Sequence, residues 1–510
     1  MRISRLYIAY KGIRRLRTII SALVRHGFYP LMETTGLVRF LSITYRLAGK
    51  KISRMKEELP FAVRTRLVFE ELGPTFIKFG QILSTRPDIV PEEFIAELLK
   101  LQDKVPPFPF IDAKAILESE LKKPIAQLFL KIDETPVAAA SIAQVHRALT
   151  ASGEKVAVKI QRPLIRETIE TDISILRYLA RTAHRYIPES RCYDPLGMVD
   201  EFSRNIIKEL DFTLEASHTE TFRKNFANDP RVKVPRVVWE ATTKKVLTME
   251  EVHGIKVDNI AELKKQGIDT QRTAHLIADT FFKQVFDFNL FHGDLHSGNI
   301  FVIDENTIAL VDFGIVGFVD LQMKRDLTDI LIGLTKTDFE ALSRVYLRMG
   351  ILPEDIDETD FSREHHEMIQ HYFGRPFGHV KIGELLLDYI KLASRYEIRL
   401  KKDFLLFDKC LMELEGLMKL LYPDANILGE AGPYAERLIK ERLSPVALAK
   451  DGIQTAGEYS ELIRELPRQT EQIIKKILSD RFTIEVSHRG IEEFMGEIDR
   501  SSNRVTFGLI

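Results

Sequence analysis

The stretch "FHGDLHSGNIFVIDENTIALVDFG", residues 291–314, places two carboxylates and a carboxamide beside short apolar runs. Asp294 is followed by Asn299 five positions later and by Asp312 eighteen positions later. The runs "IFVI" and "IALV" between the last two predict a pair of strands, so the three polar side chains lie on flanking loops. Such groups can hold a metal ion and a phosphate, or they can merely cap turns.

The spacing of these residues matches the catalytic loop of a protein kinase. There, the Asp of H-R-D orients or deprotonates the acceptor, an Asn five residues later binds the metal, and the D-F-G Asp bridges metal and phosphates. The corresponding residues here are His292-Gly293-Asp294, Asn299 and Asp312-Phe313-Gly314. The combination favours a catalytic Asp294 and the metal ligands Asn299 and Asp312 over accidental turn caps.

A kinase also needs a lysine on a strand to bind the α and β phosphates, held by a glutamate from a helix behind it. Lys159 in "VAVK" meets the first need, because alternation along "KVAVKI" separates it from Val156, Val158 and Ile160. An exposed strand lysine is the alternative. The helix containing "KELDFTLEASHTETF" offers Glu209, Asp211 and Glu215, and we expect Glu215 to be the ion-pair partner.

The loop that should cover the phosphates departs from an ordinary kinase. In place of G-x-G-x-x-G the chain has "VAAASIAQV", and the alanine Cβ atoms narrow the conformations open to the backbone. From the alanine loop we predict an altered geometry of the bound nucleotide and weak phosphoryl transfer to protein substrates. The alternative is that the segment is a plain tight hairpin. The candidates for nucleotide binding are Ala138, Ala139, Ala140, Ser141, Lys159, Glu215, Glu251 and Val252.

Taken together, these motifs resemble the UbiB-type atypical protein kinases, the bacterial branch of the family that includes the mitochondrial coenzyme Q kinases and the plastid plastoglobule kinases. The resemblance covers residues 73–317 and rests on "KFGQ", "AAAS", "VAVK", "ELD", "HGDLHSGN" and "DFG", in that order. It implies that a K-x-G-Q segment folds over the nucleotide pocket and blocks protein substrates. Lys78 and Gln81 would then face Glu209 and Asp211.

The resemblance further implies ATP and Mg²⁺ as ligands, ATPase or small-molecule phosphotransfer activity, and a role in making prenylated quinones such as ubiquinone. Its implied partners are a lipid or quinone precursor, other quinone-biosynthesis enzymes and the membrane surface. Two rival functions remain open. One is a nucleotide-gated lipid-binding scaffold that extracts quinone precursors; the other is a small-molecule kinase of the aminoglycoside or choline type, which does not explain "KFGQ" or the alanine loop.

Composition narrows the remaining possibilities. Lys plus Arg number 73 against 74 Asp plus Glu, so no global positive field exists to hold a nucleic-acid backbone. Two cysteines, Cys192 and Cys410, fit no zinc spacing and no disulfide framework, which favours a reducing compartment. A hydrophobic content of 45% in 510 residues supplies two or three folding units.

The N-terminal stretch combines basic residues with an apolar stripe. Seven basic residues precede the first acid, Glu33, while apolar residues from Ile13 to Val24 recur at helical spacing. Such a helix can lie in an anionic membrane surface, or it can pack on its own protein. The chain turns apolar again at "VTFGLI", where the family's transmembrane hairpin would start. From the family resemblance and the basic helix, we expect peripheral attachment to the cytoplasmic face of a bacterial inner membrane.

The predicted fold class is α+β, a protein-kinase-like bilobal fold with an N-terminal helical extension over the active site. Short Val- and Ile-rich runs after Pro124 predict an antiparallel sheet with a hairpin at Gly153, and "PRVVWEA" and "KVLTMEEV" predict two further strands. The expected domains are basic N-terminal helices at 1–60, a K-x-G-Q extension at 61–123, an N-lobe at 124–253, a helical C-lobe at 254–480 and a C-terminal segment at 481–510.

Overall fold

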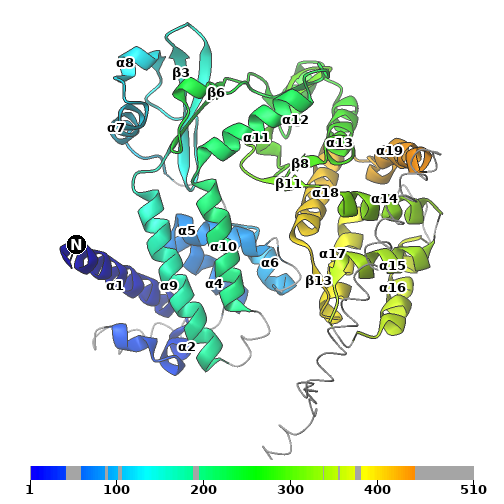
Figure 1. The fold of residues 1–510 in the computed structure, drawn as a ribbon, viewed down its shortest axis with the longest axis horizontal. Helices are drawn as coiled ribbons and strands as arrows, with labels where there is room; N and C mark the ends of the chain where they lie inside the picture. Colours follow the sequence, from blue (N-terminus) through cyan, green and yellow to red (C-terminus); the bar gives the residue numbers. More distant parts are fainter. Residues whose placement is uncertain are drawn as a thin grey trace, which may run out of the picture. The chain divides into compact units, whose positions relative to one another are not determined.

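A computed structural model describes most of the chain and divides it into two compact units, residues 1–436 and 437–510. The strands, drawn as arrows in Figure 1, belong to the first unit, as do the residues of the candidate site. Cys192 and the "VTFGLI" segment lie outside the described residues. The described ranges are 2–41, 59–84, 86, 90–101, 106–187, 194–336, 338–353, 356–373 and 381–442.

A five-stranded antiparallel sheet forms the small lobe. Its order is β1-β3-β4-β6, with β2 paired to β3, and Gly153 adopts a positive φ of 83° in the β3–β4 turn. The predicted sheet and its hairpin are thus confirmed. The strands are β1 (Phe129–Ile132), β2 (Ala138–Ala139), β3 (Ala143–Thr150), β4 (Lys155–Gln161) and β6 (Val246–Glu250).

Side-chain alternation along β4 fixes which face of the sheet carries chemistry. Val156, Val158 and Ile160 are fully buried on one face, where they pack in one cluster with Ala113 and Leu117 of α7 (Phe110–Leu121). Lys159 leaves the strand on the opposite face, as the sequence pattern predicts. The short helix α8 (Ile125–Leu128) leads from α7 into β1.

One predicted strand was wrong. The "PRVVWEA" segment makes only an isolated bridge, from Val237 to Met249, and then turns into the 3-10 helix η3 (Trp239–Ala241). The regular pairing next to it belongs to β5 (Val232–Lys233), which joins β10 of a second sheet. The "PRVVWEA" segment therefore connects two sheets and does not form a regular strand in either of them.

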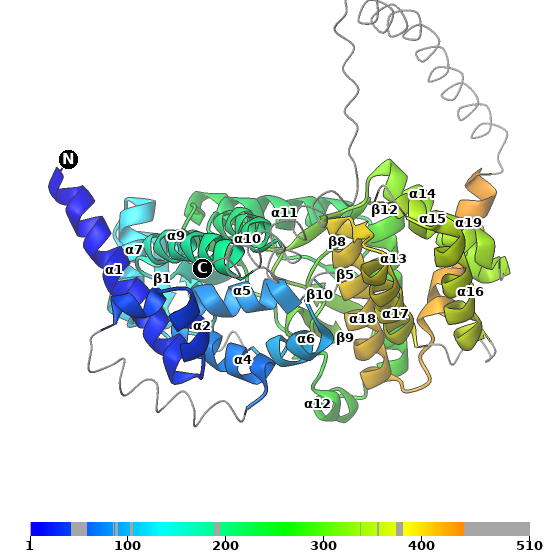
Figure 2. The same ribbon diagram turned by 90° about the horizontal axis from the view of Figure 1, so that it is seen from below.

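An N-terminal group of helices packs on α9 and α10 (Figure 1, Figure 2). Gly73, whose φ is 89°, ends α4, and Pro74 is the first residue of α5. Proline is well suited to that position, because its missing N–H would be unpaired there anyway. The elements are α1 (Arg2–Arg25), α2 (Tyr29–Thr34), η1 (Leu37–Phe40), α4 (Phe61–Leu72), α5 (Pro74–Ser84), α6 (Glu92–Leu98), α9 (Ile165–Tyr186) and α10 (Pro195–Glu209).

The apolar stripe of α1 is covered by protein. Leu16, Ile20 and Val24 are buried in a cluster that includes residues of α9 and α10. Arg15 on the same helix forms an ion pair of 2.7 Å with Asp172, which is fully buried. Of the two sequence interpretations, the helix packed on its own protein describes this stretch, and an apolar face lying in lipid does not.

The larger lobe is helical and carries a small sheet that pairs β12 with β13, and two further small sheets beside the catalytic loop. Of these two, the first has the order β5-β10-β9-β7, and the second pairs β8 with β11. Within the described ranges, no helix is both long and apolar enough to cross a bilayer. The strands here are β7 (Ile255–Lys256), β8 (Leu290–His292), β9 (Ile300–Asp304), β10 (Thr307–Leu310), β11 (Val316–Phe318), β12 (Gly350–Ile351) and β13 (Arg399–Leu400). The helices are α12 (Ile260–Lys265), α13 (Thr270–Phe286), α14 (Leu321–Lys336), α15 (Phe339–Met349), α16 (Glu358–Phe373), α17 (Ile382–Arg395), α18 (Lys402–Leu421) and α19 (Ile427–Arg442).

Candidate active site

Lys159 is held by a glutamate from the helix behind the sheet. Its Nζ donates to both carboxylate oxygens of Glu215, at 2.8 and 2.9 Å. Glu215 lies in the first turn of α11 (Phe212–Asn225), and the side chain of Asp211 caps that helix by accepting from the Thr213 N–H at 3.2 Å. The cap fixes where α11 begins, and the start of the helix determines the position of Glu215 relative to Lys159.

Asp312 reaches the same lysine from the other lobe. Its Oδ2 lies 3.3 Å from Lys159 Nζ. The backbone at Asp312 adopts a φ of 60°, a region that non-glycine residues enter rarely. The next residue, Phe313, is fully buried and its ring centroid is 4.6 Å from that of Phe222. The buried phenylalanine anchors the turn, so the aspartate side chain is directed back toward the lysine.

The three charges set one another's protonation states. Burial alone would lower the pKa of Lys159, but the carboxylates of Asp312 and Glu215 raise it above its ordinary value. Burial opposes ionisation of Asp312, yet the Lys159 ammonium lowers the pKa of this carboxyl to about 2. Burial raises the pKa of Glu215 to about 7. The site thus holds a charged lysine and an ionised Asp312 at neutral pH.

His292 fixes the backbone of the catalytic loop. Its Nδ1 accepts from the Asp294 N–H at 3.1 Å, so its Nε2 carries the proton that it donates to the Val311 carbonyl at 3.0 Å. Burial lowers the pKa of His292, which favours this neutral form. The side-chain amide of Asn299 donates to the Asp294 carbonyl at 3.1 Å. That bond leaves the carbonyl oxygen of Asn299 available as a ligand.

Sequence reasoning missed the residue that contacts Asp294 most closely. Lys409 on α18 forms an ion pair of 2.8 Å with Asp294 Oδ1 and a second of 3.3 Å with Glu413. His296 Nε2 lies 3.4 Å from the other Asp294 oxygen. The signal was present in "FLLFDKCLMELEG", where a lysine interrupts a mostly apolar helix, but nothing local connects it to a loop more than one hundred residues away.

The K-x-G-Q expectation is met in part. Lys78 Nζ lies 3.2 Å from Glu209 Oε1, across the junction of α5 and α10. Gln81 instead donates to the Leu101 carbonyl at 3.3 Å. Asp211 is engaged in its helix cap and in an ion pair of 3.3 Å with Lys244. The glutamine therefore secures α5 to the segment after α6 and does not face Asp211.

The alanine loop forms a tight hairpin. Ala138 and Ala139 pair with Val145 and Gln144, and the Ala140 N–H donates to the Ala143 carbonyl at 2.8 Å. The Arg162 Nε donates to the Ala140 carbonyl at 2.9 Å. No hydrogen bond described in the structure joins residues 138–141 to Lys159 or Asp312.

Glu251 and Val252 follow the last strand of the small sheet. The Glu251 N–H donates to the Lys155 carbonyl at 3.1 Å, and its carboxylate forms an ion pair of 2.6 Å with Arg147. Both contacts hold the start of the inter-lobe connection against β3 and β4. The side chain and the N–H of Glu251 are therefore engaged within the sheet, and its carbonyl is the group left for any ligand at this position.

A sheet lysine, its helix glutamate and a loop that carries Asp294, Asn299 and Asp312 define a protein-kinase-like domain. A model of the ABC1 atypical kinase-like domain matches residues 100–346, and a model of the UbiB helical domain matches residues 365–426. The chain belongs to the UbiB family of atypical kinase-like proteins. The fold is accordingly α+β and protein-kinase-like, with an N-terminal helical extension.

Similar proteins extend over nearly the whole chain. A "Probable protein kinase UbiB" from Azotobacter vinelandii is 34% identical over 472 residues, covering 91% of this chain and 88% of that protein. Another from Marinobacter nauticus is 34% identical over 497 residues, covering 96% and 90%. A solved structure, the complex of Rv3197 with erythromycin from Mycobacterium tuberculosis, is 26% identical and covers 76% of this chain and 96% of that chain, with a TM-score of 0.48.

Proposed function

We propose that this chain binds Mg-ATP between the small sheet and the catalytic loop and uses it for ATP hydrolysis or phosphoryl transfer in isoprenoid quinone biosynthesis. The observation that supports this most is the meeting of Lys159 with two carboxylates from opposite sides, at 2.8 Å from Glu215 and 3.3 Å from Asp312. A lysine in that arrangement is suited to binding the phosphates of a nucleotide.

The donor groups fit magnesium. Asp312 is ionised and Asn299 retains its carbonyl oxygen, and both are hard oxygen ligands. No cluster of three or more His, Cys, Asp or Glu side chains suited to a metal occurs among the described residues. Magnesium sites in phosphoryl-transfer enzymes commonly use one or two protein oxygens and complete their coordination with substrate phosphates and water. Bound magnesium would offset the charge that builds on the phosphates.

The remaining residues would divide the work as follows. Asp294, ionised beside Lys409, would orient the attacking hydroxyl or water. Lys78 and Glu209 would hold the N-terminal extension in place, so that a bulky protein substrate is excluded. The alanine hairpin at 138–141 would restrict the position of the nucleotide.

Family membership supports the quinone assignment and argues against the aminoglycoside- or choline-type kinase. The name that relatives carry, "Probable protein kinase UbiB", supports kinase-like chemistry. We further propose a lipid or quinone precursor as the small-molecule partner, contact with other quinone-biosynthesis enzymes, and peripheral association with the inner membrane. Nucleic acid is not a proposed partner.

One experiment separates transfer from a nucleotide-gated lipid scaffold. ATP turnover by the purified chain is measured with and without phenolic quinone precursors and anionic lipid, with Asp294→Asn as a control. A labelled small molecule indicates phosphoryl transfer. Stimulated turnover without a phosphorylated product indicates the scaffold. If the wild-type chain shows no magnesium-dependent turnover under any of these conditions, both the phosphoryl-transfer and the scaffold hypotheses are excluded.

A further inference from the structure

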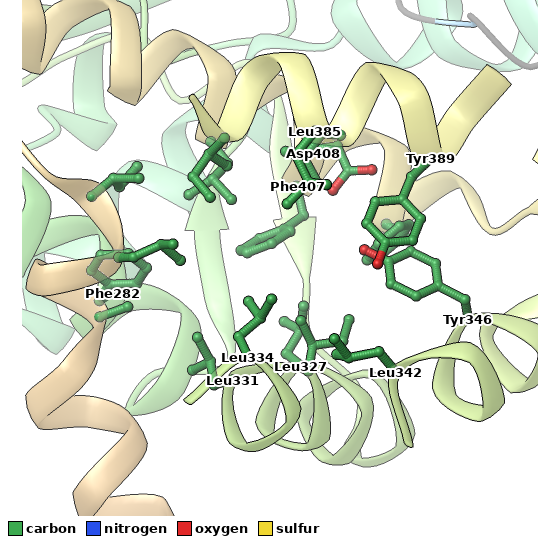
Figure 3. Close-up of a pocket in the computed structure, with 18 of the residues that line it drawn as sticks. Phe282, Leu327, Leu331, Leu334, Leu342, Tyr346, Leu385, Tyr389, Phe407 and Asp408 are labelled. Carbon is green, nitrogen blue, oxygen red and sulfur yellow. The ribbon is translucent and has the colours of Figure 1, made fainter. Parts of the chain in front are cut away.

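The helical lobe contains a cavity away from the residues assigned to nucleotide. It has a volume of about 70 Å³ and is partly open to solvent. Side chains from α13, α14, α15, α17, α18 and α19 line it, nearly all of them apolar. Figure 3 shows Phe282, Leu331 and Leu334 among the apolar side chains that line the cavity.

Polar groups gather at only one end of the cavity. Figure 3 shows the Asp408 carboxyl and the hydroxyls of Tyr346 and Tyr389 on the same side. The two tyrosine rings stack with centroids 3.8 Å apart, which fixes that wall. The site therefore has an apolar body and a single polar end, the usual layout of a small-molecule pocket.

Asp408 is the group in this cavity that lacks a hydrogen-bond partner. The residue is 1% exposed, and no partner for its Oδ1 occurs among the described residues. A buried polar atom of this kind is costly unless something binds it. Burial also raises the pKa of Asp408 well above its ordinary value, which favours the neutral acid. A neutral carboxyl can donate one hydrogen bond and accept another.

We propose that this cavity binds a small apolar molecule, a ring or branched alkyl group, that carries one hydroxyl or carbonyl head group hydrogen-bonded to Asp408. The apolar lining would bury the body of the ligand. The unpartnered carboxyl oxygen would select the head group, because a hydrocarbon of the same shape leaves that oxygen unpaired. A charged ligand is disfavoured, since the lining offers no opposite charge in exchange for the lost hydration.

The cavity is linked to the catalytic loop through α18. Asp408 is directed into the cavity, and the next residue, Lys409, forms the ion pair with Asp294. Phe407 lines the cavity and also packs edge-on against Phe291, which precedes His292 of the catalytic loop, with centroids 6.0 Å apart. An occupant of the cavity would therefore contact α18, the helix whose Lys409 forms the ion pair with Asp294. The binding proposal itself does not depend on nucleotide binding.

Phenol and toluene provide the test, because they share a shape and differ in a hydroxyl and a methyl group. Binding of each to the full chain is measured by titration calorimetry and by saturation-transfer NMR. We expect phenol to bind about tenfold more tightly than toluene, the fold-change that corresponds to one hydrogen bond. Equal affinities, or no binding of either compound up to its solubility, would overturn the proposal.

Variants locate the effect. Asp408→Leu should remove the preference for phenol while keeping toluene binding, and Asp408→Asn, which still forms hydrogen bonds, should keep the preference. Leu334→Phe should weaken both ligands by filling the cavity. Thermal unfolding checks that each variant folds. If Asp408→Leu fails to fold, Asp408→Asn and the wild-type comparison still decide, and a phenol preference that survives in a folded Asp408→Leu chain would place the site elsewhere.

Discussion

Lys409 on α18 lies 2.8 Å from Asp294, the residue at the catalytic aspartate position. The lysine comes from the helical region that follows the kinase-like match, since α18 falls within the UbiB helical domain at 365–426. Burial opposes ionisation of Asp294, but the Lys409 ammonium lowers the pKa of this carboxyl overall. The helical domain thus contributes a charge to the loop where chemistry is proposed.

Lys409→Met is expected to raise the pKa of Asp294, because burial then acts without the compensating ammonium. The acid limb of the pH profile for ATP turnover should move to higher pH. Turnover at pH 6 should fall at least about tenfold, a part of the 10²- to 10⁴-fold effect of a positioned base. A steady-state pH–rate profile measures both effects.

Lys419→Met is the matched control for that variant. Lys419 lies on the same helix and forms an ion pair of 2.6 Å with Glu415, which is not part of the site. Its loss should leave the acid limb where it is in wild type. If both variants lower turnover equally at every pH, Lys409 supports the helix and does not act on Asp294.

Asp312→Asn is expected to abolish magnesium-dependent ATP hydrolysis, with a loss of about 100-fold or more, because the metal loses a charged ligand. Asparagine tolerates the positive φ of 60° at this position, so the backbone turn should persist. Phosphate release with and without magnesium measures the effect. The same substitution at exposed Asp304 is the control, and wild-type turnover in Asp312→Asn would exclude Asp312 as a ligand.

Ala139→Gly is expected to tighten Mg-ATP binding several-fold, since removal of the Cβ lets the hairpin backbone approach the phosphates. Ala139 pairs with Gln144, so the variant should also lose about 0.5–1 kcal/mol of stability. Calorimetry with ATP and with ADP measures affinity, and Ala151→Gly in the exposed β3–β4 turn is the control. Unchanged affinity for both nucleotides would mean that this loop does not cover the phosphates.

The strong local patterns predicted the fold well. Alternation in "KVAVKI" places Lys159 opposite a buried apolar face, as the structure describes. The failure at "PRVVWEA" is instructive, because its β-branched residues fit a strand locally. Strand formation depends on continued pairing with a neighbour, and the backbone bonds from Arg236 and Val238 to β6 make a single bridge, at Val237, before the chain turns into η3. Pairing is a property of the whole sheet and is not encoded in one run of residues.

Local motifs with short spacings were enough to predict several site residues. Contacts between segments that are far apart in the sequence were missed. Glu215 was the expected partner among three acids in one predicted helical stretch, and it contacts Lys159 at 2.8 Å. Lys409 was not found, since its 2.8 Å contact with Asp294 depends on how α18 packs against the loop. Gln81 was expected to face an acid but binds the Leu101 carbonyl, a contact that depends on the position of α6.

Membrane association is expected to depend on the polar face of α1. Deleting the helix is a poor test, because Ile20 and Val24 are buried and their removal would expose the core. Arg14 and Arg17 are exposed, and charge reversal at both should weaken binding to anionic liposomes more than tenfold, at about 1 kcal/mol per basic residue. Liposome sedimentation measures it. Charge reversal of Lys264 and Lys265 on α12 is the control. If the two variants bind anionic liposomes equally, α1 does not mediate membrane association.

Acid should destabilise the helical lobe through His365. This residue is fully buried on α16, bonded to Ser343 and, at 2.7 Å, to the Tyr389 hydroxyl, and burial lowers its pKa to about 3. The unfolded chain binds a proton at this histidine below about pH 6.5, whereas the folded chain does so only near pH 3. Its contribution to stability is therefore complete above pH 6.5 and is lost as the pH falls from 6.5 toward 3, at up to about 1.4 kcal/mol per pH unit.

Urea unfolding of wild type and His365→Gln between pH 7.5 and 4.5 tests this linkage. The variant should be about 1–3 kcal/mol less stable at pH 7.5, because it loses well-aligned hydrogen bonds. The gap should narrow as the pH falls, since glutamine does not titrate. His371→Gln, at an exposed position of the same helix, should follow the wild-type slope. A gap that stays constant across the series would mean that His365 is protonated in the folded chain as readily as in the unfolded one.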